Sequence, residues 1–539
     1  MQSTMMQVPL NVAHLLERGR LFFGTHEIVS RLPDKSLART NFAAIHDRAR
    51  RLAKALVGAG VKQGEAVGTF MWNSSWHLEA YFGIPVAGAV LHTINLRLSP
   101  QDIAYIIEDA GDRVVLVDDV LLPLFEKVLA FTKVDRIIVV PTSGAAVPDG
   151  YESYEDFIAE DAADYRYPEL DENAPCGMCY TSGTIGRPKG VVHSHRAVVL
   201  HALSVSLPDC LNLSCHDSVF VVTPMFHVNA WGVPFAAAMV GCSLQFPGQH
   251  MGPEDLLDIM ESEKVTLALG VPTIWMSIRQ TLDRQPDRWK LGHGTRMMVG
   301  GAAVNPALVG GLEAHGLSIK HGWGMTELTP VGTLSWLKPE HTSLPPEKQY
   351  EIRARQGLPI PLMELRIMGD EGVQPWDGES VGELQVRGPI VTGGYHNQPT
   401  GDDKVTADGW FRTGDVAAID PEGYMRISDR TKDLIKSGGE WISSVDLENA
   451  IMGHPAVAEA AVIAVQHPKW DERPLAVVVK REGHEVTAEE LRAFIAPRFA
   501  KWQLPDDFAF VDALPHTSTG KFLKSALRKQ FEDFVSSAP

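Results

Sequence analysis

The chain has 539 residues, of which 45% are apolar and 22% are charged, and its formal net charge is −18. The composition is typical of a globular protein, and the length allows about three or four folding units of ordinary size. The negative charge argues against a nucleic-acid partner, which favours a basic surface, so an anionic ligand must be attracted by local positive groups.

The chain shows no sign of a membrane span or a secretory signal. No apolar run reaches the roughly 20 residues that a span needs. Residues 1–10 lack a basic region followed by an apolar core, and the final Ser-Ser-Ala-Pro is neither a peroxisomal address nor a lipidation motif. We therefore expect no transmembrane segment and a cytoplasmic location. Five cysteines, a sparse and odd number, do not indicate a disulfide framework.

The first three quarters of the chain alternate helical stretches with short β-branched runs. Residues 41–60 are predicted as an amphipathic helix, because Ile45, Ala49 and Leu52 recur near helical spacing. Continuous apolar runs predict strands at 114–117, 137–140, 266–269 and 297–299. Such strands between amphipathic helices indicate an α/β fold whose sheets are covered on both faces.

Two cysteines, Cys176 and Cys179, have the spacing of a redox motif. They directly precede a loop that is rich in glycine and hydroxyl residues. We therefore interpret residues 176–179 as a strand that enters this loop, and not as a redox or zinc site.

The loop at residues 180–190 (Tyr-Thr-Ser-Gly-Thr-Ile-Gly-Arg-Pro-Lys-Gly) is predicted to bind phosphate. Glycines allow several backbone N–H groups to face one anion, and hydroxyl and lysine side chains add further donors. A polyphosphate is the natural ligand of such a loop, although a plain surface turn is the alternative. The spacing is not that of a Walker A loop, because no Gly-Lys-Ser/Thr run opens a helix. The candidate ligands are Thr181, Ser182, Gly183, Thr184 and Lys189.

Small residues follow the strand predicted at 297–299. The run Gly300, Gly301, Ala302 and Ala303 would let a flat ring or an acyl chain lie against the backbone, and a tight turn is the alternative.

Two carboxylates further along are candidates for binding chemistry. Glu327 is a candidate Mg²⁺ ligand, or else an acid that begins a helix. Asp415 can accept hydrogen bonds from the vicinal hydroxyls of a ribose, or else it caps its own turn.

The last third changes in character. Residues 345–391 consist of short strands and turns, including 362–367 and 382–387, and predict a small, partly antiparallel β unit. Beyond residue 429, a helix at 445–452, strands at 461–465 and 475–479, and a helix at 488–499 predict a small α+β domain.

Lysines, an arginine and a histidine complete the candidates. Arg430 would place a fixed charge near a ribose or an α-phosphate, and Lys521 would add a compact charge that reaches a carboxylate and an α-phosphate together. The alternative for Lys521 is a solvated basic face. His227 lies in an apolar segment, where a histidine is more often a satisfied core group. The two glycines within residues 436–444 would allow close approach of a slender group such as pantetheine.

Five motifs in a fixed order support a family resemblance. The loop at 180–190 is followed by 321–327 (His-Gly-Trp-Gly-Met-Thr-Glu), 410–415 (Trp-Phe-Arg-Thr-Gly-Asp), 429–433 (Asp-Arg-Thr-Lys-Asp) and 515–521 (Pro-His-Thr-Ser-Thr-Gly-Lys). Over essentially the full chain, this order resembles the adenylate-forming superfamily of acyl-CoA synthetases, peptide-synthetase adenylation domains and luciferases. Ile185 departs from it, because the family usually has a second threonine there.

The resemblance implies a two-domain fold. Residues 1–429 would form the adenylation domain, with two α/β sheets and a distorted β-barrel, and residues 430–539 a small mobile α+β domain. The hinge would lie at 429–433, with Lys432 as its pivot. Two further departures lie nearby: Asp429 stands where glycine is commoner, and Asp446 where glutamate is usual.

The resemblance also implies roles for individual residues. Catalysis is assigned to Lys521, His227 and Arg430, and Mg²⁺ binding to Thr184 and Glu327. The acyl pocket is assigned to His227, Val228, Trp231, Gly300, Gly301, Gly324, Met325 and Pro330, with Trp231 matching a gate to the acyl tunnel in long-chain enzymes. Binding of ATP and CoA is assigned to the loop ligands above and to Gly301, Ala302, Ala303, His321, Gly322, Trp323, Gly324, Thr326, Asp415, Lys432, Lys436, Gly438, Gly439, Glu440 and Trp441.

The implied activity is an AMP-forming acyl-CoA synthetase that uses ATP, Mg²⁺ and CoA. Its acid is expected to be a medium- or long-chain fatty acid, with a short thioether acid such as 3-methylmercaptopropionate or an aryl acid as alternatives. A stand-alone ligase that charges a carrier protein, a luciferase-like oxygenase and a non-catalytic adenylate sensor are further alternatives. Relatives often form dimers through the large domain, so we expect a homodimer.

Overall fold

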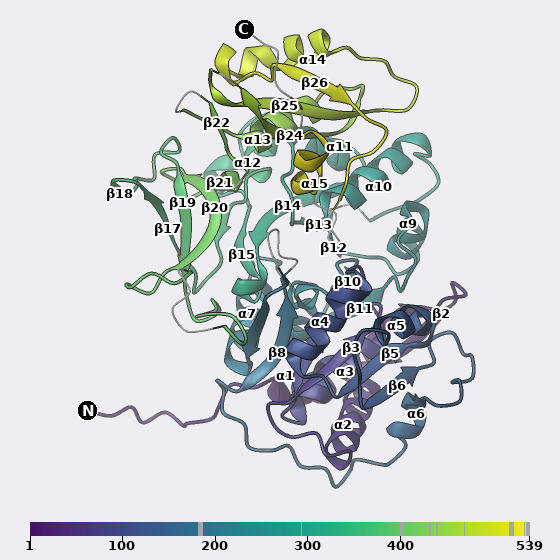
Figure 1. The fold of residues 1–539 in the computed structure, drawn as a ribbon. Coiled ribbons are helices and arrows are strands. Elements are labelled where there is room, and N and C mark those ends of the chain that lie inside the picture. Colours follow the sequence, from purple (N-terminus) through teal and green to yellow (C-terminus); the bar gives the residue numbers. More distant parts are fainter. Residues whose placement is uncertain are drawn as a thin grey trace.

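The computed structural model describes residues 1–181, 187–292, 294–398, 404–430, 433–437, 440–467, 469–516, 522–532 and 534, with only the backbone for Glu440 and Trp441. Two large sheets and a smaller one form the body, and a compact C-terminal unit lies at one end (Figure 1). None of the helices in these ranges combines the length and apolar character needed to cross a membrane.

The two large sheets are mainly parallel, with antiparallel strands at their edges. The first has the order β16 (Leu358–Pro359), β15 (Val331–Leu334), β14 (Leu317–Gly324), β13 (Thr295–Val299), β12 (Leu267–Gly270), β10 (Ser218–Val221), β11 (Ser243–Phe246), β1 (Glu27–Arg31) and β2 (Leu37–Asn41). The second has the order β7 (Glu152–Ser153), β6 (Arg136–Val140), β5 (Val114–Asp118), β3 (Ala66–Phe70), β4 (Val90–Thr93), β8 (Pro175–Tyr180) and β9 (Gly190–Ser194).

One hydrophobic core joins the two large sheets. It contains Val67 of β3, Val219 of β10, and residues of the helices that pack together between the sheets, such as Phe235. These helices are α1 (Val12–Phe23), α2 (Phe42–Gly58), α3 (Ser75–Val86), α7 (His195–Ser206) and α8 (Val233–Val240). Because helices also cover the outer faces, β3 and β5 are buried along their whole length, which explains the apolar run at 114–117 in β5.

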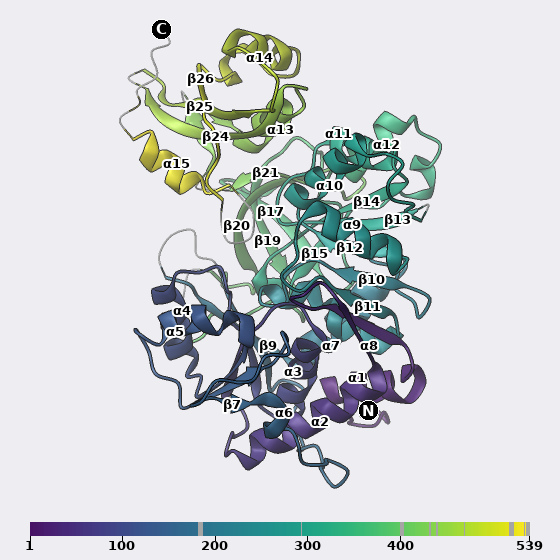
Figure 2. The same ribbon diagram turned by 90° about the vertical axis from the view of Figure 1, so that its right-hand side faces the viewer.

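Further helices cover the outer faces with separate cores. They are α4 (Pro100–Ala110) and α5 (Leu122–Val128) on the second sheet's side, and α9 (Pro253–Ser262), α10 (Pro272–Arg284), α11 (Pro306–Glu313) and α12 (Pro346–Arg353) on the first sheet's side (Figure 2). The short α6 (Tyr154–Phe157) instead packs on the core that joins the two sheets, through Tyr154. The short 3₁₀ helices are η1 (Asp119–Leu121), η2 (Val228–Gly232), η3 (Thr326–Leu328), η4 (Pro339–His341), η5 (Ala496–Arg498) and η6 (Lys501–Gln503).

A five-stranded antiparallel sheet forms the small β unit. Its order is β18 (Gly372–Val373), β17 (Glu364–Gly369), β19 (Gly382–Arg387), β20 (Phe411–Ile419) and β21 (Met425–Arg430). The unit was predicted to include a distorted barrel. Within the described residues, the pairing of these strands leaves β18 and β21 as edges and does not close a barrel.

The C-terminal unit is an α+β structure with its own cores. Its sheet has the order β23 (Glu440–Ile442), β22 (Ile435–Ser437), β25 (Asp471–Lys480) and β24 (Val457–His467), and β26 (Asp507–Phe510) pairs with β25. Its helices are α13 (Ser444–Met452), α14 (Ala488–Ile495) and α15 (Lys524–Gln530). In Figures 1 and 2, α15 lies on the side of this unit that faces the body.

Most of the predicted elements are present, and the α/β class with a small C-terminal α+β unit is confirmed. The helix expected at 41–60 is α2, which begins after Asn41 because this side chain caps it. The helix expected at 488–499 ends at Ile495 and continues as η5, because Pro497 lacks the N–H that an α-helix requires. Cys176 and Cys179 lie in the predicted strand β8, and all five cysteines are free. The domain boundary at 429/430 stays a prediction; β21 ends beside it, at Arg430.

Candidate functional site

The predicted phosphate loop joins two antiparallel strands. Tyr180 at the end of β8 pairs with Gly190 at the start of β9. Thr181 N–H donates to the Lys189 carbonyl over 2.9 Å, and Lys189 N–H donates to Thr181 Oγ1 over 3.4 Å. The base of the loop is therefore a hydrogen-bonded hairpin. The predicted ligands Ser182, Gly183 and Thr184 lie outside the described residues.

Lys189 and Glu327, far apart in the sequence, meet through one tyrosine. Lys189 Nζ lies 4.7 Å from the centre of the Tyr395 ring, and Tyr395 Oη donates to Glu327 Oε1 over 2.7 Å. A backbone hydrogen bond joins the same two segments, because Thr392 N–H donates to the Glu327 carbonyl over 2.8 Å. The candidate metal ligand is thereby fixed beside the base of the phosphate loop.

The environment of Glu327 combines burial with positive charge. Glu327 is only 5% exposed to solvent. Burial raises the pKa of Glu327, while the Tyr395 hydrogen bond and the charges of Lys404 and Arg430 oppose this rise. Glu327 does lie in a short 3₁₀ helix, as the alternative interpretation held, but its carboxylate accepts from Tyr395.

Sequence reasoning missed Tyr395. The two glycines before it, Gly393 and Gly394, are exposed, and they precede an aromatic residue that packs against the core. This glycine–glycine–aromatic run is the signal that could have drawn attention to the segment. Its contact with Glu327 crosses 68 positions of sequence and has no local pattern.

A buried histidine supports the segment that contains Glu327. His193 of β9 donates from Nε2 to the carbonyl of Thr326 over 2.8 Å. Burial lowers the pKa of His193, so the ring is held in its neutral form. Because β9 also begins at the phosphate loop, one strand fixes both the loop and the start of η3.

Asp415 is bound by an indole and a guanidinium. Trp323 Nε1 donates to Asp415 Oδ2 over 2.8 Å, and Arg430 Nε lies 3.4 Å from Asp415 Oδ1. Strand pairing imposes the second contact, since Asp415 of β20 lies opposite Arg430 of β21. Asp415 therefore lies in a strand and contacts two other predicted site residues, Trp323 and Arg430, instead of capping its own turn.

The small-residue run 300–303 lies against β14, as a continuation of the predicted strand β13. His321 Nε2 lies 3.1 Å from the Ala302 carbonyl, and His321 Nδ1 lies 2.7 Å from the Ala354 carbonyl. Gly301 has φ +89°, where a residue with a Cβ would be strained. Gly301 and Ala302 are exposed and Ala303 is half-buried, so their backbone can be reached by a ligand.

Tight packing explains several of the predicted site glycines. A Cβ on Gly322 would lie 2.8 Å from the Thr333 carbonyl oxygen, and one on Gly324 would lie 2.2 Å from the Pro330 carbonyl oxygen. Met325 N–H donates to the same carbonyl over 3.0 Å. The structure thus requires glycine at both positions for packing, whatever further role they have.

A left-handed turn shapes the acyl-side segment. Val228, Asn229, Ala230 and Trp231 have φ of +50°, +52°, +46° and +57°. For residues with a Cβ this region costs about 1–2 kcal/mol each, and such strain clusters at functional sites. Asn229 is held in place by Cys179, whose Sγ donates to Asn229 Oδ1 over 3.5 Å.

This turn brings Trp231 to the end of β13. A Cβ on Gly300 would lie 3.3 Å from the Trp231 ring and 3.2 Å from the Gly322 carbonyl oxygen. Trp231, assigned to the acyl pocket, and Gly322, assigned to the adenine pocket, therefore both lie close to Gly300. His227, which precedes the turn, is half-buried and not a core group.

The predicted site residues of the C-terminal unit are only partly described. Lys436 is exposed in β22, and its N–H donates to Glu472 Oε2 over 2.8 Å. The residues that lie outside the described ranges are Lys432, Gly438, Gly439 and Lys521, and the side chains of Glu440 and Trp441.

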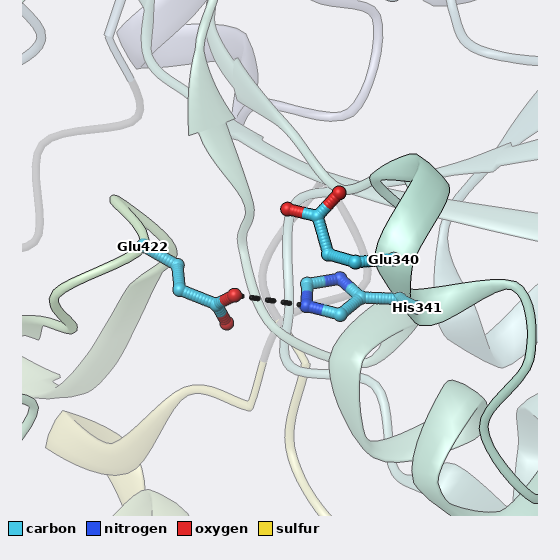
Figure 3. A group of neighbouring side chains, drawn as sticks. All are labelled: Glu340, His341 and Glu422. Atoms are coloured by element: carbon cyan, nitrogen blue, oxygen red, sulfur yellow. Dashed lines mark hydrogen bonds and ion pairs between the residues drawn. The ribbon is translucent and has the colours of Figure 1, made fainter.

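A separate group of side chains that could ligate a metal lies between η4 and the small β unit. In Figure 3, His341 points toward Glu422, with Glu340 beside it. His341 Nε2 lies 3.0 Å from Glu422 Oε1, and His341 Nδ1 lies 3.2 Å from the Tyr424 hydroxyl. These bonds join η4 to the turn between β20 and β21. None of these residues was predicted for the site, and we assign the group a structural role.

Comparison with known proteins agrees with the motif order. The sequence matches the AMP-binding enzyme family over residues 25–396 and the AMP-binding enzyme C-terminal domain over residues 446–521. The chain is 49% identical to a long-chain-fatty-acid–CoA ligase of Thermus thermophilus (99% of this chain, 98% of the relative). It is 44% identical to a 3-methylmercaptopropionyl-CoA ligase of Ruegeria pomeroyi (99% of this chain, 100% of the relative).

The fold agrees with solved structures as well. An anthranilate CoA ligase in complex with anthranoyl-AMP superposes with a TM-score of 0.86 at 26% identity, over 99% of both chains. The resemblance predicted from five motifs is thus confirmed over the full length. The chain belongs to the AMP-binding enzyme family, among its acyl-CoA ligases.

Proposed function

We propose that this protein activates a medium- or long-chain fatty acid with ATP, forming an acyl-adenylate and pyrophosphate, and then transfers the acyl group to the thiol of CoA with release of AMP. The observation that supports this most strongly is the contact chain Lys189–Tyr395–Glu327 at the base of the phosphate loop. It gathers a cation and a carboxylate where the phosphates of ATP are expected.

The chemistry of the first step is one of positioning and charge neutralisation. A carboxylate oxygen attacks the α-phosphorus, the bond to the bridging oxygen of pyrophosphate breaks, and no protein nucleophile is required. We assign phosphate binding to Thr181, Ser182, Gly183, Thr184 and Lys189. Lys521 would contact the reacting carboxylate and α-phosphate, Arg430 would add charge beside them, and His227 would line the carboxylate pocket.

Adenosine is assigned to the segments around β14 and β20. The adenine would lie between the run Gly301, Ala302 and Ala303 and the β14 residues His321, Gly322, Trp323 and Gly324, next to Thr326. Asp415 would accept hydrogen bonds from the ribose hydroxyls. Trp323 supports this role, because its hydrogen bond fixes the orientation of the Asp415 carboxylate.

Magnesium is the cation that suits this donor set. Glu327 offers a carboxylate oxygen, the kind of ligand that Mg²⁺ prefers, and Tyr395 fixes its orientation. We propose that Glu327 and Thr184 hold the ion, which when bound would neutralise phosphate charge. Tyr395 and the nearby Lys404 and Arg430 favour the ionised form of Glu327 against its burial.

The second step needs a different arrangement of the small domain. We propose that it turns about Lys432, so that Lys521 leaves the site and the run Lys436, Gly438, Gly439, Glu440 and Trp441 enters to line the CoA thiol path. One arrangement cannot place both sets of residues at the same reacting carbon, so a rotation is required.

The proposed acid follows from the segment at Trp231. The Trp231 ring packs against Gly300. Both residues belong to the predicted acyl pocket, which is made up of His227, Val228, Trp231, Gly300, Gly301, Gly324, Met325 and Pro330. A ring at that position limits how deep the pocket is, and its displacement would open room for a chain. The similarity to a long-chain-fatty-acid–CoA ligase supports the same choice, and the similarity to a 3-methylmercaptopropionyl-CoA ligase keeps a short thioether acid as the second candidate.

A substrate panel tests the proposal. AMP release would be followed with ATP, Mg²⁺ and CoA for saturated acids of increasing length, 3-methylmercaptopropionate, benzoate and cinnamate. We expect the highest kcat/KM for a medium- or long-chain acid. A preference for the thioether acid or an aryl acid would overturn the substrate assignment while leaving the ligase reaction intact. The homodimer and the cytoplasmic location stay predictions.

A further inference from the structure

The two residues that depart from the family pattern, Asp429 and Asp446, lie at the boundary between the body and the C-terminal unit. Asp429 ends the body of the protein in β21, and Asp446 lies in α13 of the C-terminal unit. Asp446 Oδ2 lies 3.0 Å from Arg426 Nη1 of β21, in a pair whose Arg426 side chain is 44% exposed and whose Asp446 side chain is half-buried, at 32%. The two aspartates therefore lie on either side of Lys432, the predicted pivot of the hinge at 429–433.

Of these two aspartates, Asp429 is the fully buried one. It is 1% exposed, and its Oδ2 accepts from Ser444 N–H over 2.7 Å and from Ser444 Oγ over 2.5 Å. Ser444 is the first residue of α13, whose backbone N–H groups lack partners within the helix. A carboxylate from the body thus occupies the positive end of a helix in the mobile domain. The neighbouring Ser443 Oγ donates to the carbonyl of Ser428 across the same boundary.

A buried lysine extends this contact to the catalytic segment. Lys524 Nζ donates to Ser444 Oγ over 2.5 Å and lies 2.7 Å from Glu448 Oε1. Lys524 is 9% exposed, and Glu448 also accepts from Val462 N–H over 2.8 Å. Lys524 begins α15, three positions after Lys521 in the sequence. The position of this helix is therefore linked to Asp429 through one serine hydroxyl.

A second ion pair holds α15 to the segment that follows the predicted pivot. Arg528 of α15 lies 2.5 Å from Asp433, which follows the predicted pivot. Asp433, Ser444 and Lys524 belong to the side of the hinge that is expected to move, and Asp429 to the side that is not. A rotation about Lys432 would carry Ser444 and Lys524 away from Asp429 and would break the two hydrogen bonds between Ser444 and Asp429 Oδ2.

We infer that Asp429 is a positioning residue: through Ser444 and Lys524 it holds the C-terminal domain in the arrangement of this structure, and so sets how readily the enzyme passes between its two half-reactions. The inference rests on the proposed two-step function. Hydrogen bonds to a charged group are each worth enough to shift an equilibrium about tenfold or more. Loss of this contact would therefore favour the other arrangement.

Asp429→Ala and the near-isosteric Asp429→Asn test this inference. Each half-reaction is measured alone: pyrophosphate release in a single turnover without CoA, and thioester formation from supplied acyl-adenylate and CoA. We expect the two rates to change in opposite directions, with their ratio shifted about 10- to 100-fold in Asp429→Ala and less in Asp429→Asn. The matched control is Asp446→Asn, which removes the charge from a pair at the same boundary that water can still reach, and which should shift the ratio less than threefold, since solvent-accessible ion pairs contribute little.

The possible results distinguish failure of this inference from failure of the proposed ligase function. Equal losses in both half-reactions, with a lowered melting temperature, would show that Asp429 only stabilises the fold and would overturn the inference. An unchanged ratio in a stable Asp429→Ala protein would also overturn it. If the unaltered enzyme performed neither half-reaction, the proposed function itself would fail, whatever the variants do.

Discussion

Replacing Tyr395 by phenylalanine removes one hydroxyl and leaves the ring that faces Lys189. The lost hydroxyl donates to Glu327 Oε1 over 2.7 Å, and Glu327 is 5% exposed, so water cannot readily replace the donor. A hydrogen bond to a charged group contributes about 1.5–3 kcal/mol, which corresponds to roughly 10- to 100-fold in an equilibrium constant. If Glu327 holds Mg²⁺, the apparent Mg²⁺ affinity of Tyr395→Phe should fall by this factor.

The pKa of Glu327 determines how the loss of Mg²⁺ affinity should depend on pH. Burial already raises that pKa, and Tyr395 opposes the rise, so the variant's carboxyl should protonate at a higher pH. Protonation removes the charge that attracts the cation. The loss of Mg²⁺ affinity should therefore be larger at pH 6 than at pH 8.

The assay is acid-dependent pyrophosphate release at fixed ATP over a range of free Mg²⁺ concentrations. Tyr167→Phe is a matched control, because the Tyr167 hydroxyl also donates to a glutamate, Glu17, over 2.7 Å but lies outside the candidate site. The control should keep the Mg²⁺ dependence of the unaltered enzyme. A Tyr395→Phe enzyme with an unchanged Mg²⁺ dependence at both pH values would refute the assignment of Glu327 as a metal ligand positioned by Tyr395.

Further predictions address other parts of the account. Lys521→Ala should abolish adenylation but leave thioester formation from supplied acyl-adenylate largely intact, and equal loss of both half-reactions would contradict the two-arrangement mechanism. Trp231→Ala should broaden the chain-length preference because the ring that packs against Gly300 is removed, whereas unchanged selectivity in kcat/KM would exclude a gate. Burial lowers the pKa of His77 and of His201 to about 3, so both histidines are neutral in the folded protein. Because the unfolded chain binds these protons from about pH 6.5 downward, stability should fall with decreasing pH by up to about 1.4 kcal/mol per unit for each histidine. Urea unfolding at pH 7, 6 and 5 measures this, and a slope that His201→Gln fails to reduce would contradict the assignment.

The parts of the fold that could be predicted are those with a local cause. Residues 114–117 of β5 are all apolar because helices cover both faces of this strand, and the apolar residues of α2 recur at helical spacing along its buried face. Glycine and hydroxyl residues identified the phosphate loop, since a loop that binds an anion must expose backbone donors. Motif order then allowed the family and the two-unit architecture to be inferred.

The parts that could not be predicted depend on contacts between distant segments. The left-handed turn at 228–231 contains no glycine that would have marked it, and the surrounding packing imposes it on Val228 and Trp231. The bond between Tyr395 and Glu327, like that between Trp323 and Asp415, exists only because the sheets bring separate loops together. Asp429 was noted only as a departure from the family pattern, and its partners became visible only in the structure.

The central claim is that one active site couples ATP cleavage to AMP with thioester formation. The most direct measurement is the product balance for a saturated medium- or long-chain acid with ATP, Mg²⁺ and excess CoA. The account predicts one AMP, one pyrophosphate and one acyl-CoA for each ATP consumed. Formation of ADP and phosphate, or AMP release without any thioester at saturating CoA, would contradict it.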